Sequence, residues 1–499
     1  MELFNEFKAI QKKLNAYHFV LNIANWDSNT EAPKNCFPYR AEMLSFISGE
    51  AFSISTSKAY QEVVNGLIER LDELSEREQA EVLQAKKALD KIVKIPKEDY
   101  VKYNKLLNLA QRTWEEAKEK NDYNMYKDTL KDIINTQRKF IEYRDTGLEP
   151  YDVLLDDFEE GMTMELYDAF FNTIKKDLVP FVKEVLKAKE AQKADQSFIT
   201  AFYPKAKQKE FVEYLMNVFR FDYDRGVLKQ SVHPFTWNTH SQDVRLTVRY
   251  LEDFVFSSIF AAIHELGHAL YEQQIDPALD STNLAGGASM GIHESQSRFY
   301  ENMIGRSYPF WEKHYPKLKS IFSEELKDID LDTFYKGINN VEESFIRVEA
   351  DELTYPLHIL LRYEMERAIF NDHVDLDSLP ALWNEKMKSY LNIMPKNDGD
   401  GILQDVHWSG GAFGYFPTYA LGSAYAAQIY YTLTKELDFE TLIKEDRIEE
   451  INAWLKEKIH QFGKSKKPLE ILESVTNEPF NPDYYVRYLK EKYSAIYLK

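Results

Sequence analysis

Several kinds of residue are scarce in this chain. One cysteine, Cys36, among 499 residues cannot form an intrachain disulfide or a multi-cysteine zinc knuckle, so we expect a reducing compartment, by default the cytoplasm. Glycine and proline number only 18 and 17, which favours long helices over many short strands and turns. No run of about 18 apolar residues occurs, and the charged, amphipathic start has no apolar stretch of signal-peptide length. We therefore expect neither a membrane span nor a secretory signal.

Basic residues are also outnumbered. Lys and Arg total 62 against 82 Asp and Glu, which gives a formal net charge of −20. An acidic surface repels nucleic acid and anionic membranes, so we expect neither as a partner. The remaining composition, with 44% hydrophobic and 29% charged residues, is ordinary for a globular protein with a large core.

Most of the chain has the periodicity of amphipathic helices. Residues 71–93, LDELSEREQAEVLQAKKALDKIV, place apolar residues at helical spacing with charged residues between them. We predict several such helices over residues 1–140, and one or two over residues 334–370 with a break near Pro356. Residues 231–254 differ, because their β-branched and aromatic residues and the alternation of VRLTVRY predict a small β-ribbon.

The predicted fold is therefore mainly α. No low-complexity linker and no fixed-period repeat divides the chain. We expect a single catalytic domain over residues 1–499, formed by a helical lobe of about residues 1–200 and a second lobe of about residues 201–499 that carries the functional site. The small sheet is expected beside that site.

The stretch FAAIHELGHALYEQQ, residues 260–274, contains two histidines four residues apart. On a helix, His264 and His268 lie one turn apart on one face, so both rings can reach one ion. Glu265 is rotated by about 100° from His264 and reaches the open side of that ion. Zinc with three protein ligands keeps a position for water, and a carboxylate that is not a ligand can take its proton. The alternative is a core helix with two hydrogen-bonded histidines.

A catalytic zinc site needs a third ligand, and HESQSRFYEN, residues 293–302, is the best source. Glu294 follows His268 by 26 residues, which suits a second helix packed back against the first. The alternative for Glu294 is a solvated helix charge. Neighbouring His293 is better explained by packing or by a hydrogen bond to a ligand, since the histidine pair already supplies the imidazoles.

Several further motifs accompany HELGH along the chain. They are WDxxTxxP at residues 26–33 with varied interior residues, HPF at 233–235, DxRxT at 243–247, HES at 293–295, IRxxAD at 346–351 and GxxQDxHW at 401–408. In these motifs and their order the chain resembles the thermostable-carboxypeptidase family of zinc metallocarboxypeptidases, metallopeptidase family thirty-two. The resemblance covers nearly the whole chain.

The resemblance implies an almost wholly helical, neurolysin-like fold with a deep groove between two lobes. It also implies a homodimer that removes single residues from the free C-termini of peptides with broad specificity. The implied cofactor is Zn²⁺, with Co²⁺ as a substitute. The implied metal ligands are His264, His268 and Glu294, and the implied general base is Glu265.

The family also implies roles for residues outside HELGH. Arg347 is the candidate for binding the substrate carboxylate, because a guanidinium is a planar fork that is always charged. Its alternative is a structural salt bridge with Asp351, four residues on. His407 and Tyr419 are candidates for stabilising the oxyanion, with Tyr415 as the alternative tyrosine.

His233 of the HPF motif is expected to shape the closed end of the groove and so to restrict substrate length. The DxRxT motif (Asp243, Arg245 and Thr247) either contacts substrate or forms a structural hydrogen-bonded network.

Two other functions stay open at this point. A helical endo-oligopeptidase also has HExxH with a downstream glutamate, although IRVEAD and GILQDVHW favour a carboxypeptidase. A helical scaffold that binds peptide or metal without turnover is the third hypothesis, and the intact Glu265 argues against it.

Overall fold

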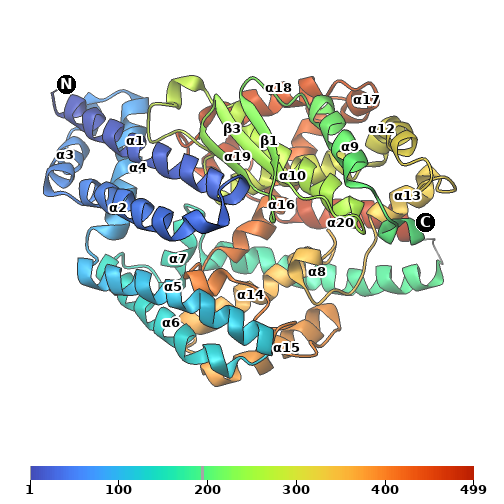
Figure 1. The fold of residues 1–499 in the computed structure, drawn as a ribbon, viewed down its shortest axis with the longest axis horizontal. Helices are drawn as coiled ribbons and strands as arrows, with labels where there is room; N and C mark the ends of the chain where they lie inside the picture. Colours follow the sequence, from blue (N-terminus) through green and yellow to red (C-terminus); the bar gives the residue numbers. More distant parts are fainter. Residues whose placement is uncertain (1, 193–195, 499) are drawn as a thin grey trace. The chain divides into compact units, whose positions relative to one another are not determined.

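The computed structural model describes residues 2–192 and 196–498, and it is mainly helical with one small sheet among those residues (Figure 1). The chain divides into two compact units, each built from separate stretches. Unit 1 comprises Met1–Val93, Asp195–Ile338 and Ile429–Asn477, and unit 2 comprises Lys94–Ala194, Asn339–Gln428 and Glu478–Lys499. The chain passes from unit 2 to unit 1 between residues 194 and 195, close to the predicted lobe boundary near residue 200. The two predicted lobes and the groove between them stay predictions.

Unit 1 contains the N-terminal helices, the sheet and the HELGH helix. Its elements are α1 (Glu2–Thr30), α2 (Phe37–Ser55), α3 (Lys58–Ile68), α4 (Glu76–Ile92), α9 (Lys205–Val218), β1 (Gly226–Gln230), β2 (Thr236–His240), β3 (Asp243–Val248), α10 (Val255–Gln273), α11 (Met290–Arg298), the π-helix η5 (Phe299–Gly305), α12 (Tyr308–Ile321), α13 (Leu331–Ile338), α17 (Phe439–Lys444), α18 (Ile448–Lys458) and α19 (Pro468–Thr476).

Among the described residues of unit 2, the regular elements are all helices, joined by irregular stretches. Its elements are α5 (Lys97–Lys120), α6 (Asn124–Arg144), α7 (Pro150–Phe158), α8 (Met164–Ala191), α14 (Tyr355–Phe370), α15 (Leu379–Leu391) and α20 (Asp483–Tyr497). Helix α16 (Phe416–Glu436) begins in unit 2 and ends in unit 1.

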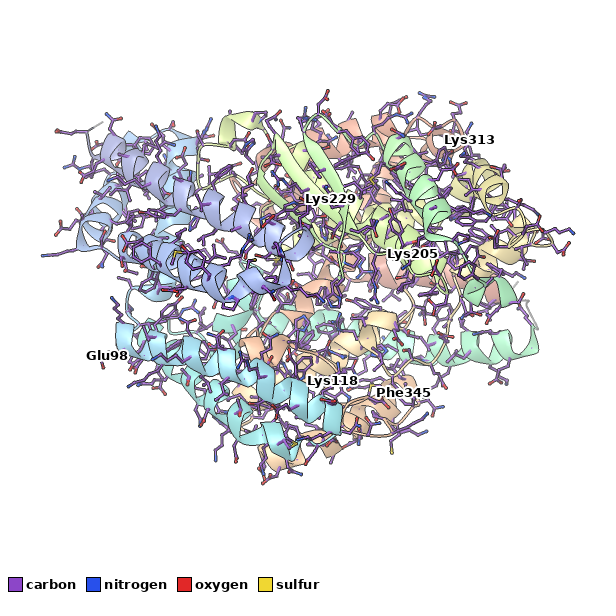
Figure 2. The ribbon with its side chains drawn as sticks, viewed as in Figure 1. Glu98, Lys118, Lys205, Lys229, Lys313 and Phe345 are labelled. Atoms are coloured by element: carbon purple, nitrogen blue, oxygen red, sulfur yellow. The ribbon has the colours of Figure 1, made fainter. Side chains whose placement is uncertain are left out.

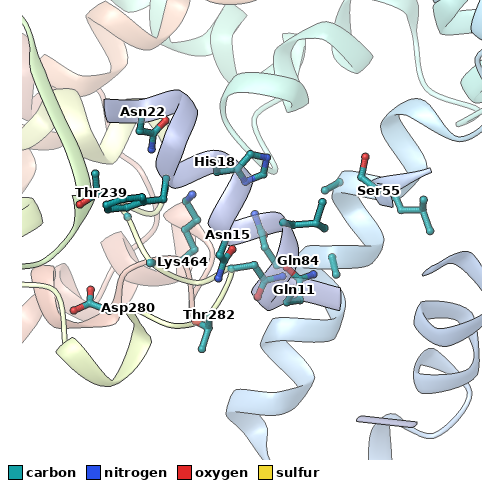
Figure 3. A pocket seen from close by; sticks show the side chains of 18 of the residues that line it. Gln11, Asn15, His18, Asn22, Ser55, Gln84, Thr239, Asp280, Thr282 and Lys464 are labelled. Atoms are coloured by element: carbon teal, nitrogen blue, oxygen red, sulfur yellow. The ribbon is translucent and has the colours of Figure 1, made fainter. Parts of the chain in front are cut away.

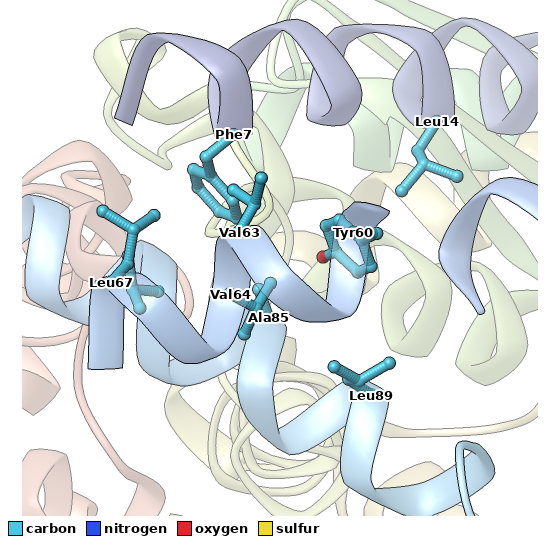
Figure 4. Close-up of a cluster of buried hydrophobic side chains, with 9 residues drawn as sticks. Phe7, Leu14, Tyr60, Val63, Val64, Leu67, Ala85 and Leu89 are labelled. Carbon is cyan, nitrogen blue, oxygen red and sulfur yellow. The ribbon is translucent and has the colours of Figure 1, made fainter. Parts of the chain in front are cut away.

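Local sequence explains where the N-terminal helices begin and how they pack. Ser75 and Glu78 form a reciprocal capping box that starts α4, within the stretch that the periodicity predicts to be helical. The apolar faces of α1, α3 and α4 meet in a buried cluster (Figure 4). Phe7, Val64 and Val82 are fully buried in it. Burial of such side chains contributes about 1.5–3 kcal/mol each, which is how amphipathic helices of modest intrinsic stability are held.

The predicted β-ribbon is confirmed, and it is one part of a three-stranded sheet of order β1-β3-β2. Strands β2 and β3 form the antiparallel hairpin, while β1 runs parallel to β3. The sequence analysis missed β1, because its five residues GVLKQ are too short to show a clear alternation. Both β2 and β3 pack against α10, so the sheet lies beside the helix that carries HELGH, as predicted.

The prediction for residues 334–370 is wrong in one respect. Pro356 does not break a helix there but occupies the first turn of α14, where its missing N–H costs nothing. Residues 339–354 between α13 and α14 are not α-helical; a short 3₁₀ turn at Arg347–Glu349 is their only regular element. The i,i+4 geometry assumed for Arg347 and Asp351 is therefore absent.

No helix within residues 2–192 and 196–498 is both long enough and apolar enough to cross a membrane.

Lysine side chains such as those of Lys205, Lys229 and Lys313 are exposed to solvent (Figure 2). The N–H of the Lys229 ammonium donates to Glu31 across 2.6 Å.

Candidate active site

Helix α10 is a core helix that still presents two histidines on one side. Its sequence VFSSIFAAIHELGHALYEQ is apolar on most faces, and nearly all of its residues are buried. His264 and His268 are half-buried, as are Ser257 and Ala261 on the same side of the helix. The two histidine rings lie 4.9 Å apart and almost perpendicular, so both point toward the same space.

Gly267, inside HELGH, allows α10 to approach α11 closely. A Cβ at this position would lie 2.7 Å from Ser297 Cα and 2.8 Å from the backbone oxygen of Gln296. Ser289 caps the N-terminus of α11, since its side chain accepts a hydrogen bond from the Ile292 N–H. This packing sets Glu294, near the middle of α11, opposite the two histidines.

Three donor atoms converge as the sequence predicts. Glu294 Oε2 lies 3.6 Å from His264 Nε2 and 3.6 Å from His268 Nε2, and all three ligand atoms lie within 4.8 Å of one another. Donor atoms about 2.1 Å from a tetrahedral ion are about 3.4 Å apart. The residues present therefore fit one metal ion of the zinc type, with a two-nitrogen, one-oxygen donor set.

His264 is held by a buried carboxylate behind it. Its Nδ1 lies 3.0 Å from Glu301 Oε2, so Nδ1–H donates to the carboxylate and Nε2 keeps its lone pair for an ion. Arg298 joins the two acidic residues, since its Nε donates to Glu294 Oε1 at 2.7 Å and its Nη1 to Glu301 Oε2 at 3.1 Å. Arg306 donates to the other oxygen of Glu301. Glu301 lies in the π-helix η5, a geometry that is frequent at functional sites.

His268 is held by a chain of two residues. Its Nδ1 lies 2.5 Å from His293 Nδ1, and His293 Nε2 lies 2.8 Å from Glu272 Oε1. If His268 offers Nε2 to an ion, its Nδ1–H donates to His293, whose Nε2–H then donates to Glu272. His293 therefore forms a hydrogen bond with the predicted ligand His268, one of the two interpretations that the sequence offers for it.

The electrostatics of His268 and Glu294 favour metal binding, whereas for His264 the carboxylates of Glu294 and Glu301 outweigh burial and raise the pKa. Burial, followed by the charge of His293, lowers the pKa of His268 to about 3, so its ring is neutral and available near pH 7. Burial opposes ionisation of Glu294, but Arg298 and His264 outweigh it and its pKa is lowered. The same balance, with Arg298 foremost among the attractive charges, lowers the pKa of Glu301 to about 2. Both carboxylates are therefore negative at any working pH.

Glu265 lies beside the ligands without being one of them. It is buried, and Thr236 Oγ1 on strand β2 lies 2.8 Å from its Oε2 and 2.8 Å from its backbone oxygen. Burial raises its pKa above the ordinary value, although His264 and Thr236 oppose the rise. A carboxylate that is oriented and more basic than usual is suited to accepting a proton.

Four of the other predicted residues gather in unit 2, around a buried ion-pair cluster. Arg347 donates from Nε and Nη2 to Asp405 Oδ1 at 3.0 and 2.9 Å, and from Nη1 to the Tyr355 hydroxyl at 3.2 Å. Arg362 donates to the other oxygen of Asp405 at 2.7 Å. Two guanidiniums thus share one carboxylate, which leaves one net positive charge in a buried site.

The expected alternative partner of Arg347 is corrected here. Asp351 accepts hydrogen bonds from the Leu353 and Thr354 N–H groups and so caps the segment before α14. It cannot reach Arg347 as a helical i+4 neighbour, because the chain between them is a 3₁₀ turn and an extended residue. Arg347 is structurally paired, but its partner Asp405 comes from the GILQDVHW motif.

His407 and the two predicted tyrosines lie together in the same cluster. His407 Nε2 is 3.3 Å from the Tyr419 hydroxyl, and the Tyr415 and Tyr419 rings are 5.2 Å apart. The Arg347 guanidinium lies 5.0 Å from the centre of the Tyr419 ring. Burial, then the charge of Arg347, lowers the pKa of His407 to about 4, so the ring is neutral near pH 7.

His233 and the DxRxT motif lie in unit 1, and none of the described hydrogen bonds or ion pairs joins them to the three donor residues. His233 is exposed on the connection between β1 and β2. Arg245 donates two hydrogen bonds to Asp243 and lies 5.7 Å from the Trp26 ring, which packs on Phe235. The HPF, DxRxT and WDxxTxxP residues thus form one network, which favours the structural interpretation of DxRxT.

The sequence analysis did not single out Glu301, Arg298, Glu272 or Thr236. The position of Glu272 near His268 could have been predicted from the sequence, because Glu272 follows His268 by four residues and so lies on the same helix face. The other three belong to elements whose packing against α10 is a tertiary property. Nothing in a local pattern marks Thr236 as the partner of Glu265.

The chain is similar over nearly its whole length to known metallocarboxypeptidases. The family model for carboxypeptidase Taq (M32) metallopeptidases matches residues 6–493. Carboxypeptidase 1 of Bacillus subtilis is 46% identical over 99% of this chain and 98% of its own length, and thermostable carboxypeptidase 1 of Pyrococcus furiosus is 36% identical over 99% and 98%. The crystal structure of an M32 carboxypeptidase from Deinococcus radiodurans superposes with a TM-score of 0.96 over 100% of both chains at 28% identity.

Proposed function

The chain belongs to the carboxypeptidase Taq (M32) metallopeptidase family and is a metallocarboxypeptidase, and from this premise we propose how its residues perform the reaction. In our proposal His264, His268 and Glu294 hold a zinc ion, and Glu265 is the general base. The observation that carries it is the position of Glu294 Oε2, 3.6 Å from both histidine nitrogens. The endo-oligopeptidase and scaffold alternatives have no comparable support.

The donor set supports zinc as the cofactor, with cobalt as a substitute. Two neutral imidazoles and one carboxylate are a ligand set of catalytic zinc sites. When bound, such an ion supplies Lewis acidity, which polarises a carbonyl and eases the deprotonation of water. Metal analysis of the purified protein, followed by reloading of the apoprotein with zinc or cobalt, tests this assignment.

Glu265 moves the proton. Its Oε2 is oriented by Thr236, and its buried position makes the carboxylate a better base than one in water. It takes a proton from the attacking water and passes it to the nitrogen of the departing C-terminal residue. One water is consumed, the peptide bond breaks, and a new carboxylate and a free amino acid result.

The residues of unit 2 recognise the substrate. Arg347 has five N–H donors, of which three are engaged by Asp405 and Tyr355, and the cluster keeps a net positive charge. It binds the free C-terminal carboxylate of a peptide. His407 and Tyr419 donate to the oxyanion that forms at the cleaved carbonyl, with Tyr415 as the alternative to Tyr419. His233 limits substrate length at the closed end of the groove.

The proposal also covers the location, assembly and partners of the protein. The protein acts in the cytoplasm, which suits a chain with one cysteine, and it assembles as a homodimer, as the family resemblance implies. Its partners are peptides with free C-termini, not nucleic acid or membrane. Light scattering after gel filtration measures the assembly, and a monomer at micromolar concentration would contradict it.

The decisive experiment compares matched peptides. A peptide with a free C-terminus is digested with zinc-loaded enzyme beside the same peptide with an amidated C-terminus, and mass spectrometry follows the products. We expect a ladder of single-residue losses from the first and no cleavage of the second. Internal cuts in either peptide would refute the recognition of a free carboxylate.

A variant separates chemistry from binding. Glu265→Gln keeps the size of the side chain but removes the base, so we expect kcat to fall by about 10²–10⁴-fold with the metal still bound. The control is Glu252→Gln, outside the described hydrogen-bond and ion-pair partners of the metal ligands, which should keep full activity. Full activity in the Glu265→Gln variant would refute the proposed role of Glu265 as the general base.

A further inference from the structure

A cavity in unit 1 is lined by none of the proposed metal ligands but shares a residue with their support. Its volume is about 540 Å³, and it is bounded by α1, α4, β2 and the loop over residues 280–286 (Figure 3). Pockets of this size accept a ligand of a few residues. The residues of α1 that line it include Asn15, His18 and Asn22.

One wall of this cavity is shared with the support of His268. Asn238 lines the cavity, and its amide donates to Glu272 Oε2 at 2.6 Å. The other oxygen, Oε1, lies 2.8 Å from His293 Nε2, and the N–H of Gly287 donates to it. Gly286, next to Gly287, also lines the cavity. The cavity therefore lies only a few contacts from the predicted ligand His268.

The lining of the cavity carries two charged groups, Lys464 and Asp280. Lys464 lines it, and within the described residues no hydrogen bond or ion pair of its ammonium is found. Its backbone is fixed, since its N–H donates to the Leu284 oxygen at 2.9 Å, and its side chain packs beside Gly286. His18 faces the same space (Figure 3).

The acidic groups near Lys464 are already satisfied. Asp280 lines the cavity, but its two oxygens accept hydrogen bonds from the N–H and the hydroxyl of Ser241 at 2.9 and 2.8 Å. Glu272 attracts Lys464 from behind the wall, yet its oxygens are held by Asn238, Gly287 and His293. Within the described residues, the Lys464 ammonium is thus the charged group of the cavity that has neither a hydrogen bond nor an ion pair, whereas both oxygens of Asp280 accept hydrogen bonds.

The opposite wall is apolar and formed by small residues. Ala85, Ala88 and Leu89 of α4 lie along it, and Ala88 is exposed at its surface. An aliphatic stem would contact this wall while a terminal charge reached Lys464. A side chain with both features is that of glutamate.

We propose that this cavity binds the part of a peptide substrate upstream of the bond that is cut, and that Lys464 there selects an acidic side chain. The proposal rests on the proposed carboxypeptidase function and deepens it. A peptide whose C-terminal residue is held for removal extends from the metal with the rest of its chain, and this cavity, which shares Asn238 with the hydrogen-bonded support of His268, has room for part of it.

The test is a scan of substrate charge. Peptides of five residues carry Glu, Gln or Lys at each upstream position in turn, with a constant C-terminal residue, and an N-acylated dipeptide serves as the short reference. At one position we expect kcat/KM for Glu to exceed that for Gln by about fivefold, the magnitude of a half-buried ion pair. Lys464→Met should remove this preference and leave the acylated dipeptide and the metal content unchanged.

Two controls keep the outcome clear. Lys466→Met removes a neighbouring lysine that lies over the Phe462 ring, and it should keep the preference. Ala88→Phe narrows the cavity from an exposed position and should raise KM for five-residue peptides but not for the acylated dipeptide. A preference that is absent in the parent, or that survives Lys464→Met, overturns the inference while dipeptide cleavage still supports the proposed function. Absence of cleavage of every peptide would instead refute that function.

Discussion

Gly267→Ala is the substitution that tests most directly how the fold assembles the metal site. A Cβ at position 267 would lie 2.7 Å from Ser297 Cα, whereas ordinary contact begins at 3.4 Å. Because the obstacle is backbone, α10 and α11 must separate locally by about 0.7 Å. Glu294 lies on α11, so its carboxylate moves relative to the two histidines. Metal sites tolerate about 0.2 Å in ligand distance, several times less than this displacement.

We expect Gly267→Ala to reduce metal affinity more than it reduces the stability of the apoprotein. Overpacking costs about 1–3 kcal/mol, and replacing a helical glycine by alanine returns about 1 kcal/mol of helix propensity. The net loss of apoprotein stability is therefore about 0–2 kcal/mol. Metal affinity should fall by about 10–100-fold, the effect seen when support of a ligand is lost.

The assay measures both quantities on the same apoprotein. Competition with a chromophoric chelator yields the metal affinity, and denaturant unfolding yields the stability. Gly49→Ala is the matched control, since Gly49 lies in α2 with no atom within 4 Å of an added Cβ. That variant should gain about 0.5–1 kcal/mol and bind metal normally. Parental metal affinity in Gly267→Ala would refute the claim that this glycine sets the ligand spacing.

The remaining predictions concern ligand support, metal removal and pH. Glu301→Gln should lower metal affinity about 10–100-fold, because His264 loses the charge that orients it; an unchanged chelator competition would contradict this. Removing metal by chelation should lower the thermal midpoint, and re-added zinc should restore it; identical apo and loaded midpoints would argue against the site. Burial lowers the pKa of His314 to about 4, from about 6.5 in an unfolded chain, so its stabilisation is complete above pH 6.5 and is lost as pH falls toward 4. His314→Gln should therefore flatten the fall of unfolding free energy over that range by at most about 1.4 kcal/mol per pH unit; a slope equal to that of the parent would show that His314 does not remain neutral.

Residues at short sequence separation were predicted well. HELGH places two histidines and a glutamate on one helix by the geometry of 3.6 residues per turn, and this arrangement is local. The β2–β3 hairpin follows from an equally local alternation of side chains. The error at Pro356 is also local in origin, since a proline can end one helix or begin another and the pattern alone does not say which.

The partners of the site residues could not be predicted. Helical spacing offers Asp351 as the alternative partner of Arg347, yet the segment is not an α-helix and the carboxylate partner, Asp405, lies 58 residues away. Glu301 reaches His264 across 37 residues, and Thr236 reaches Glu265 across 29. Such pairs depend on how elements pack, and a single sequence carries no record of that packing.

By itself, the sequence determined the helical character of the chain, the helix face that presents His264 and His268, and the motif order that resembles one peptidase family. Those properties follow from backbone geometry and from residue identity. Tertiary structure alone decided the 3.6 Å approach of Glu294 to both histidines, the carboxylates behind them and the cavity lined by Lys464. The physical reason is that ligand spacing is set by the distance between two helices, and a single missing Cβ at Gly267 controls that distance.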